Sequence, residues 1–150
     1  LAPTRMEAVL NDLKIGARSV GRSLDEIKIS PQVSIYITDN ISSAYERERA
    51  HLAFYIGGMG ISYHRYMHKI GFGLESDLIR EAYMARDRER AAKLVTDEMV
   101  TATTIVGTPQ QCRDQMQTFF DAGIDEIRLV FNEPNPEVYL QSLKAVAPNG

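Results

Sequence analysis

The sequence has one cysteine, no excess of basic residues and no long apolar run. Cys112 has no second cysteine to pair with, so an internal disulfide framework is excluded and a reducing, cytoplasmic setting is expected. Lys and Arg number 17 against 20 Asp and Glu, a net charge of -3, which disfavours nucleic acid as a partner. No apolar run approaches the roughly 20 residues of a membrane-spanning helix, so no membrane association is expected.

The composition is otherwise that of a globular chain, with 44% hydrophobic and 25% charged residues. Its 150 residues suit one domain, but fall short of the roughly 250 residues of a complete (β/α)8 barrel. The chain starts at Leu1, with neither an initiator Met nor a signal peptide, so the natural protein is expected to begin earlier.

The first half of the chain predicts a helix, a strand and then a long helical segment. Apolar residues recur at three- and four-residue steps from residue 4 to residue 19, which predicts an amphipathic helix that Gly21 helps to end. Val33, Ile35 and Ile37 alternate with less apolar residues, which predicts a strand with Pro31 near its start. Residues 40–90 predict three or more helices.

The second half predicts one more strand between two helices. Residues 96–106 are expected to form a short helix or an extended link. Thr108 and Gln111, with Pro109 between them, form a capping-box pattern for a helix whose apolar face holds Cys112, Met116, Phe119 and Phe120, and which ends at Gly123. A buried strand with Ile127, Leu129 and Phe131 follows, and then a helix over residues 136–146.

Two strands separated by helices predict a parallel crossover with open sheet edges. The missing strands are therefore expected from upstream sequence or from another chain.

Four stretches in this order carry a family resemblance: VGRSLDEIKISPQVSIYITDN, AFYIGGMGISYHRYMHKIGFG, AAKLVTDEMV and IVGTPQQCRDQMQTFFDAGIDEIRLVF. They resemble the luciferase-like monooxygenase superfamily, especially its deazaflavin (coenzyme F-420)-dependent branch with methylenetetrahydromethanopterin reductase-like oxidoreductases. The resemblance implies the C-terminal part of a (β/α)8 TIM barrel, with the last two parallel strands and a large helical insertion. It also implies a single domain over residues 1–150, an N-terminal barrel half as partner, and an active site at the carboxyl ends of the strands.

Several residues are candidates for ligand contacts. Tyr55, Gly57, Gly58 and Met59 are expected to line the cofactor cleft as the family implies, although the glycines also suit a turn between helices. Asn132 and Glu133 follow the last strand, where they form either a polar pair of the site or an ordinary turn. Gly107 and Thr108 begin a helix whose N-H groups suit an anion, although a cap alone explains them.

His64 and His68 lie four residues apart on a predicted helix, as two metal-binding histidines do. No metal site is expected, because no third ligand is evident and Arg65 stands where the HExxH pattern needs glutamate. His64 and Arg65 are instead candidates for a cationic patch that holds a phosphate or the acidic tail of a deazaflavin, or for a plain surface. Cys112 is interpreted as a packed thiol without a catalytic role.

The leading hypothesis is a portion of a flavin- or deazaflavin-dependent oxidoreductase that transfers hydride between its cofactor and a small-molecule substrate, and is inactive in isolation. Coenzyme F-420 is the expected cofactor and FMN the alternative. A second hypothesis is a non-catalytic, self-associating α/β module, and so a homo-oligomer, whose open strand edges pair between chains. A third is a small anion-binding or ligand-binding domain that uses the helix start at Gly107.

Overall fold

The computed structural model describes residues 6–133 and 135–147. The chain forms two compact units, each with its own set of internal contacts. Of the described residues, 6–41, 103–133 and 135–147 belong to unit 1 and 42–102 belong to unit 2. Unit 2 thus corresponds to the helical segment that the sequence predicts between its two strands.

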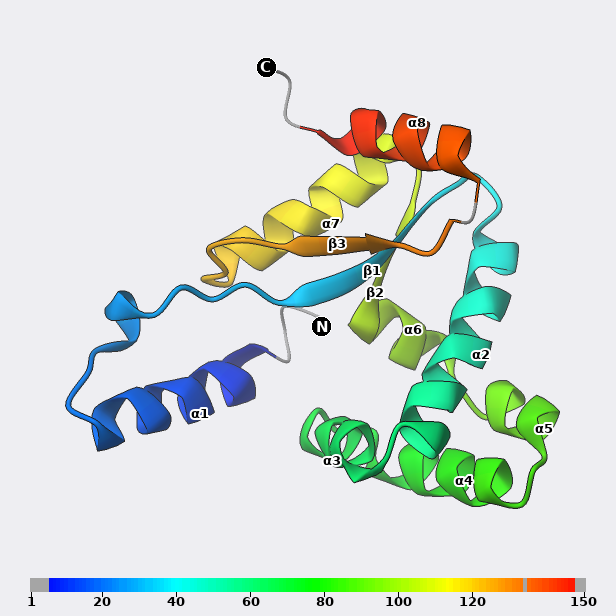
Figure 1. Ribbon diagram of the computed structural model, residues 1–150, viewed down its shortest axis with the longest axis horizontal. Coiled ribbons are helices and arrows are strands. Elements are labelled where there is room, and N and C mark those ends of the chain that lie inside the picture. Colours follow the sequence, from blue (N-terminus) through cyan, green and yellow to red (C-terminus); the bar gives the residue numbers. More distant parts are fainter. Residues whose placement is uncertain (1–5, 134, 148–150) are drawn as a thin grey trace. The chain divides into compact units, whose positions relative to one another are not determined.

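Unit 1 is built around a parallel sheet of three strands in the order β2-β1-β3 (Figure 1). The central strand β1 (Gln32–Ile37) pairs with β2 (Thr104–Gly107) on one side and with β3 (Arg128–Phe131) on the other. The two strands that the sequence predicts, β1 and β3, are therefore direct parallel neighbours. Pro31 directly precedes β1, as the sequence predicts. Its carbonyl oxygen accepts a hydrogen bond from Arg128 N at the start of β3.

The third strand corrects the prediction of two strands. Residues 96–106, expected to be a short helix or an extended link, contain helix α6 (Asp97–Thr103), and β2 follows it without a loop. Four residues are too few to display the alternation that marks a strand. The extended conformation of β2 is instead stabilised by hydrogen bonds to β1, which is distant in the sequence.

The core of unit 1 lies on one face of this sheet. Its helices are α1 (Met6–Ser19), the short 3-10 helix η2 (Leu24–Glu26), α7 (Pro109–Asp121) and α8 (Pro136–Val146). Residues 4 and 5, where the first helix was expected to start, lie outside the described residues. The buried cluster joins one face of β1 and β2 to α1, α7 and α8 and consists of Met6, Val33, Ile35, Ile105, Cys112, Phe119, Ile124 and Val146.

Two predictions about burial in unit 1 are wrong. β3 is not a buried strand, because Leu129, Val130 and Phe131 are only half-buried at the edge of the sheet. Phe120 is 43% exposed and does not share the buried face of α7. An α-helix turns by about 100° per residue, so Phe120 points well away from the direction of its buried neighbour Phe119.

Unit 2 is helical throughout, which confirms the prediction of three or more helices. Its helices are α2 (Ile41–Gly58), α3 (Ile61–Lys69), α4 (Gly73–Met84), α5 (Arg88–Lys93) and most of α6. Helix α4 packs against both α3 and α5. Fully buried side chains from four of the helices include Leu52, Ile56, Met67, Ile79 and Met99. Within the described residues, no helix is long and apolar enough to cross a membrane.

Candidate functional site at the carboxyl edge of the sheet

The carboxyl ends of the three parallel strands of unit 1 meet at one edge of the sheet. Thr38 follows β1, Thr108 follows β2, and Asn132 and Glu133 follow β3. The hydrogen bond from Thr38 N to the carbonyl oxygen of Gly107, at 2.9 Å, ties the first two ends together. The structure therefore brings the predicted residues Gly107, Thr108, Asn132 and Glu133 to the same edge, where ligands bind in parallel α/β folds.

Asn132 is the centre of a polar group on this edge. Its Nδ2 donates to Tyr36 Oη at 3.3 Å and to Ser34 Oγ at 3.5 Å. Successive side chains of a strand point to opposite faces, so Ser34 and Tyr36 lie on the face opposite Val33 and Ile35. Among the described residues, no member of the buried cluster comes from this second face of the strands.

Ser34 and Tyr36 were missed as site residues by the sequence analysis. The signal was present, because both occupy the positions of β1 that alternate with the apolar ones. What the sequence could not supply is the pairing of β1 with β3, which sets Val130 opposite Ser34 and so brings Asn132 to Tyr36. The polar group depends on that register.

Gly107 and Thr108 are accounted for by the helix cap. Thr108 Oγ1 accepts from Gln111 N at 3.3 Å, and Gln111 Oε1 accepts from Thr108 N at 2.9 Å, which is the predicted capping box. Gly107 has a φ of 151°, and a Cβ there would lie 2.7 Å from Gln111 Oε1. The free N-H groups that would attract an anion are thus partly satisfied by the chain's own side chains.

Glu133 takes part in the turn that leads from β3 to α8. Its Oε1 accepts a hydrogen bond from Asn135 N at 3.0 Å, and Asn135 in turn caps α8 through Glu137 N. This local bonding fits the turn alternative for Glu133. Asn132, whose side chain reaches the neighbouring strand, is the stronger candidate of the two for ligand contact.

The four predicted wall residues lie in unit 2, three of them in the last turn of α2 and Met59 directly after it. Gly57 and Gly58 are helical, and a Cβ on Gly57 would come within 2.3 Å of Tyr83 Cβ. The absence of a side chain at Gly57 therefore allows α2 to pack closely against α4. Tyr55 is half-buried and Met59 is 55% exposed, and their predicted contact with a cofactor stays a prediction.

Tyr55 belongs to a row of aromatic rings. Its ring lies 5.1 Å from that of Tyr63, which lies 5.8 Å from that of Tyr66. Burial, with the nearby charge of Glu48, raises the pKa of Tyr63 to about 12, and burial also raises the pKa of Tyr66. Both hydroxyls stay protonated at neutral pH, so they are suited to hydrogen bonding and not to proton transfer.

His64 and Arg65 lie on α3 of unit 2. His64 Nε2 is 2.8 Å from Asp77 Oδ1 on α4, and His68 Nε2 is 2.9 Å from the same oxygen. The hydrogen bonds with His68 and His64 hold the pKa of Asp77 below its usual value, and the carboxylate of an aspartate is charged at neutral pH in either case. A negative charge between the two imidazoles disfavours the predicted phosphate or acidic tail at this pair. Arg65 is exposed.

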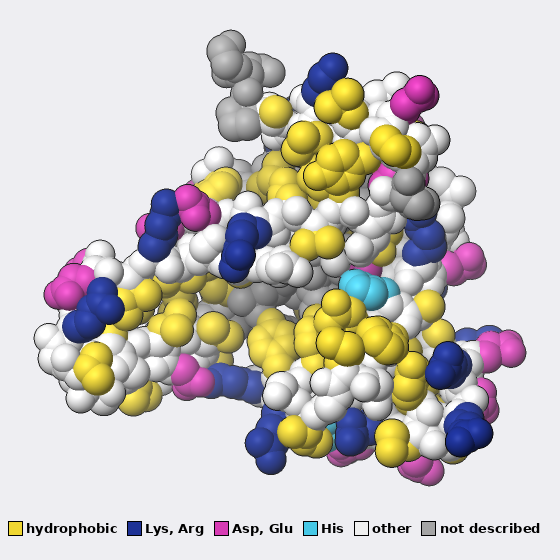
Figure 2. Space-filling model, viewed as in Figure 1, with side chains coloured by type: hydrophobic (Ala, Val, Ile, Leu, Met, Phe, Trp, Pro, Cys, Tyr) yellow, Lys and Arg dark blue, Asp and Glu magenta, His cyan; other side chains and the backbone are white. Residues whose placement is uncertain are grey.

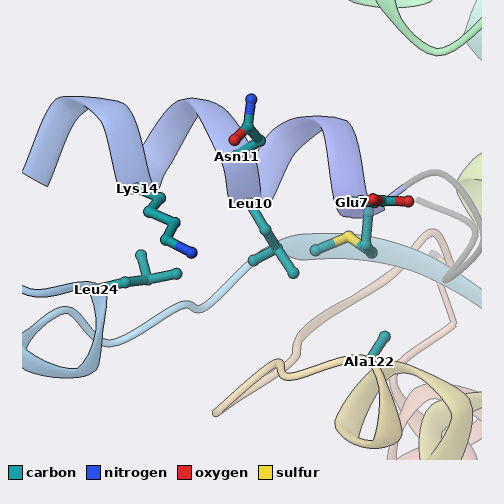
Figure 3. Close-up of a pocket in the computed structure, with 7 residues that line it drawn as sticks. Glu7, Leu10, Asn11, Lys14, Leu24 and Ala122 are labelled. Carbon is teal, nitrogen blue, oxygen red and sulfur yellow. The ribbon is translucent and has the colours of Figure 1, made fainter.

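A separate pocket of about 490 Å³ lies beside α1 in unit 1. Leu10 and Lys14 point from α1 towards the chain before β1 and the end of α7, where Leu24 and Ala122 complete the lining (Figure 3). Both of these segments precede strands. The pocket therefore lies towards the amino ends of the strands, away from the polar group at their carboxyl ends.

Comparison with known proteins places the chain in a family of enzymes. The luciferase-like monooxygenase family matches residues 1–126. A Mycobacterium tuberculosis protein named as a coenzyme F-420-dependent oxidoreductase is 29% identical over 113 residues, which cover 73% of this chain and 32% of that protein. The 5,10-methylenetetrahydromethanopterin reductase of Methanopyrus kandleri is 28% identical over 126 residues, which cover 83% of this chain and 35% of the reductase.

The fold agrees with these matches. The solved structure of the coenzyme F-420-dependent tetrahydromethanopterin reductase from Methanopyrus kandleri superposes with a TM-score of 0.70 and 25% identity, over 95% of this chain and 41% of that one. That reductase is a TIM barrel, of which this chain covers a part. The chain spans about a third of the length of the curated relatives it matches. Because the luciferase-like monooxygenase family matches residues 1–126, which are most of the chain, the chain belongs to that family.

Proposed function

We propose that this chain forms part of a coenzyme F-420-dependent oxidoreductase that transfers hydride between the deazaflavin and a small-molecule substrate. Two curated relatives and the solved structure support this proposal: two of the three are named for dependence on coenzyme F-420, and the third is named as a methylenetetrahydromethanopterin reductase. The proposal includes a larger barrel, because the chain covers only 41% of the solved reductase.

The polar group of Asn132, Tyr36 and Ser34 is the observation that carries the proposal. A deazaflavin ring is planar and has carbonyl and N-H groups along one edge, so amide and hydroxyl side chains are suitable partners for it. These three side chains lie at the carboxyl edge of parallel strands, on the sheet face opposite the buried cluster. The residues therefore fit the ring of the cofactor, which supplies the hydride chemistry when bound.

In this proposal the role of the chain is to bind and orient the ring of the cofactor. Asn132 exchanges its weak hydrogen bonds to Ser34 and Tyr36 for hydrogen bonds to the ring edge, while β1 and β3 hold the three side chains in register. The residues predicted in unit 2 remain separate proposals for cofactor contact, with Tyr55 and Met59 as an apolar wall and Arg65 as an exposed cation for the acidic tail. Without the remaining strands of the barrel, the chain is expected to have no turnover of its own.

A fluorescence titration of the chain with coenzyme F-420 and, separately, with FMN tests the proposal. We expect saturable binding of the deazaflavin, and Asn132→Ala should weaken it about three- to tenfold, as loss of one or two hydrogen bonds does. Asn11→Ala, an exposed change on α1, is the matched control and should leave binding unchanged. Equal affinities of the parent and Asn132→Ala would show that this edge does not contact the cofactor.

Self-association is a second candidate function, and a specific feature favours it. Among the described residues, the outer edges of β2 and β3 pair with no strand. Helix α8 also exposes apolar side chains, visible as a yellow group over this helix in Figure 2: Val138, Tyr139, Leu140 and Leu143. Sedimentation velocity separates the candidates, because a dimer that Leu140→Lys dissociates, without cofactor binding, would favour the self-associating module.

A further inference from the structure

Two imidazoles and one carboxylate converge on the surface of unit 2. The ligand atoms of His64, His68 and Asp77 all lie within 4.8 Å of one another. Both Nε2 atoms face the same oxygen, Asp77 Oδ1, at 2.8 and 2.9 Å. The sequence showed the histidine pair and no third ligand, and the fold supplies that ligand from the next helix.

The local structure explains why the three groups meet. Residues four apart lie on one face of a helix, so the rings of His64 and His68 are neighbours, with centroids 4.6 Å apart. Gly71, with a φ of 89°, turns the chain from α3 to α4, and the two helices pack together. A Cβ on Gly73 would lie 2.9 Å from His68 Nδ1, so this glycine makes room for the ring.

The chemistry of the three groups suits a divalent transition metal. Two imidazole nitrogens and a carboxylate oxygen are ligands that Zn²⁺ accepts, whereas Mg²⁺ and Ca²⁺ prefer oxygen alone. The carboxylate oxygen of Asp77 already lies within hydrogen-bond distance of both imidazole nitrogens, so the three ligand atoms face one another. The guanidinium of Arg80, nearby on α4, is directed to the carbonyl oxygens of Ile56 and Gly60.

We propose that His64, His68 and Asp77 bind Zn²⁺ or a similar divalent transition metal. Bonds of about 2.0–2.2 Å at tetrahedral angles place ligand atoms roughly 3.3 Å apart, so the present N-to-O distances need to open by only about half an ångström. His68 and Asp77 are 43% and 56% exposed, which leaves access for the ion and for water as a further ligand. The bound metal joins α3 to α4, so it stabilises this helix pair.

Metal titration of the full chain, prepared without a polyhistidine tag, tests the site. Co²⁺ serves as the spectroscopic probe, and Zn²⁺ binding is followed by calorimetry. We expect one ion per chain with visible Co²⁺ absorption, and a loss of affinity on the order of tenfold or more in His64→Gln, His68→Gln and Asp77→Asn. His51→Gln is the control, because the third histidine of the chain lies on α2 beside Glu48 and outside the cluster.

An NMR measurement on the unsubstituted chain tests the metal site without depending on the folding of any variant. Zn²⁺ should shift the ring resonances of His64 and His68 in NMR spectra and leave those of His51 in place. Equal shifts at all three rings, or equal Co²⁺ affinities of His68→Gln and His51→Gln, would overturn the proposal. A response of the pair to inorganic phosphate and none to Zn²⁺ would also overturn it, in favour of the anion patch.

Discussion

Cys112 illustrates how a residue's surroundings set its chemistry. The thiol is fully buried on the core face of α7, and its Sγ lies 3.4 Å from the carbonyl oxygen of Gly107. Burial raises its pKa from 9.0 to about 11, because the low-polarity surroundings disfavour the thiolate. The side chain therefore acts as a small apolar core residue, as the sequence predicted, and not as a nucleophile.

The raised pKa of Cys112 predicts a change in stability with pH. The unfolded thiol ionises near pH 9 and the folded thiol near pH 11, so the unfolded chain loses its proton first as the pH rises. The contribution of Cys112 to the free energy of unfolding is therefore fully present below pH 9 and falls between pH 9 and 11. Urea unfolding across this range should show a shallower decline for Cys112→Ala than for the parent. Parallel declines would contradict the assignment.

At the scale of single elements, the capping box of α7 is predicted to stabilise unit 1. Thr108→Ala removes the acceptor for Gln111 N and should lower the free energy of unfolding by about 1 kcal/mol. Thr118→Ala, an exposed change in the same helix, is the control and should stay within about 0.5 kcal/mol. Denaturant unfolding compares the two variants, and equal losses would show that the cap has no special role.

Those elements that carry their own local signals were predictable from the sequence. The capping box, the left-handed Gly123 after α7 and the helix from Pro136 all depend on residues within a few positions of one another. β2 was not predictable, because its four residues become a strand only through their pairing with β1. The half-burial of β3 likewise follows from its place at the edge of the sheet, which its own residues do not encode.

The same distinction between local signals and long-range packing applies to the residues of the candidate sites. Asn132 was predictable from its position just after a strand, whereas its partners Ser34 and Tyr36 required the pairing of strands far apart in the sequence. Asp77 gave no signal beside the histidine pair, because it lies on another helix and joins the pair only when α3 packs against α4. Sequence patterns thus indicate one side of each site, and tertiary packing supplies the other.

At the scale of the whole molecule, the two units have separate cores. Unit 1 is centred on the buried face of its sheet, and unit 2 on the buried side chains of α2, α3, α4 and α6. Groups of residues with their own cores open as cooperative segments of different stability. If the units open independently, a substitution that destabilises one core should therefore speed up amide hydrogen exchange in that unit alone.

Gly57→Ala is the change that tests this independence. The new Cβ meets Tyr83 at 2.3 Å, and such overpacking costs about 1–3 kcal/mol, more than the roughly 1 kcal/mol that alanine gains over glycine in a helix. Gly16→Ala, with open space in α1, should be neutral or stabilising. Hydrogen exchange of Gly57→Ala should show faster amides in α2 to α5 and unchanged amides in β1 and α7. Uniform acceleration across both units would instead show one cooperative structure, in which the helical segment and the sheet unfold together.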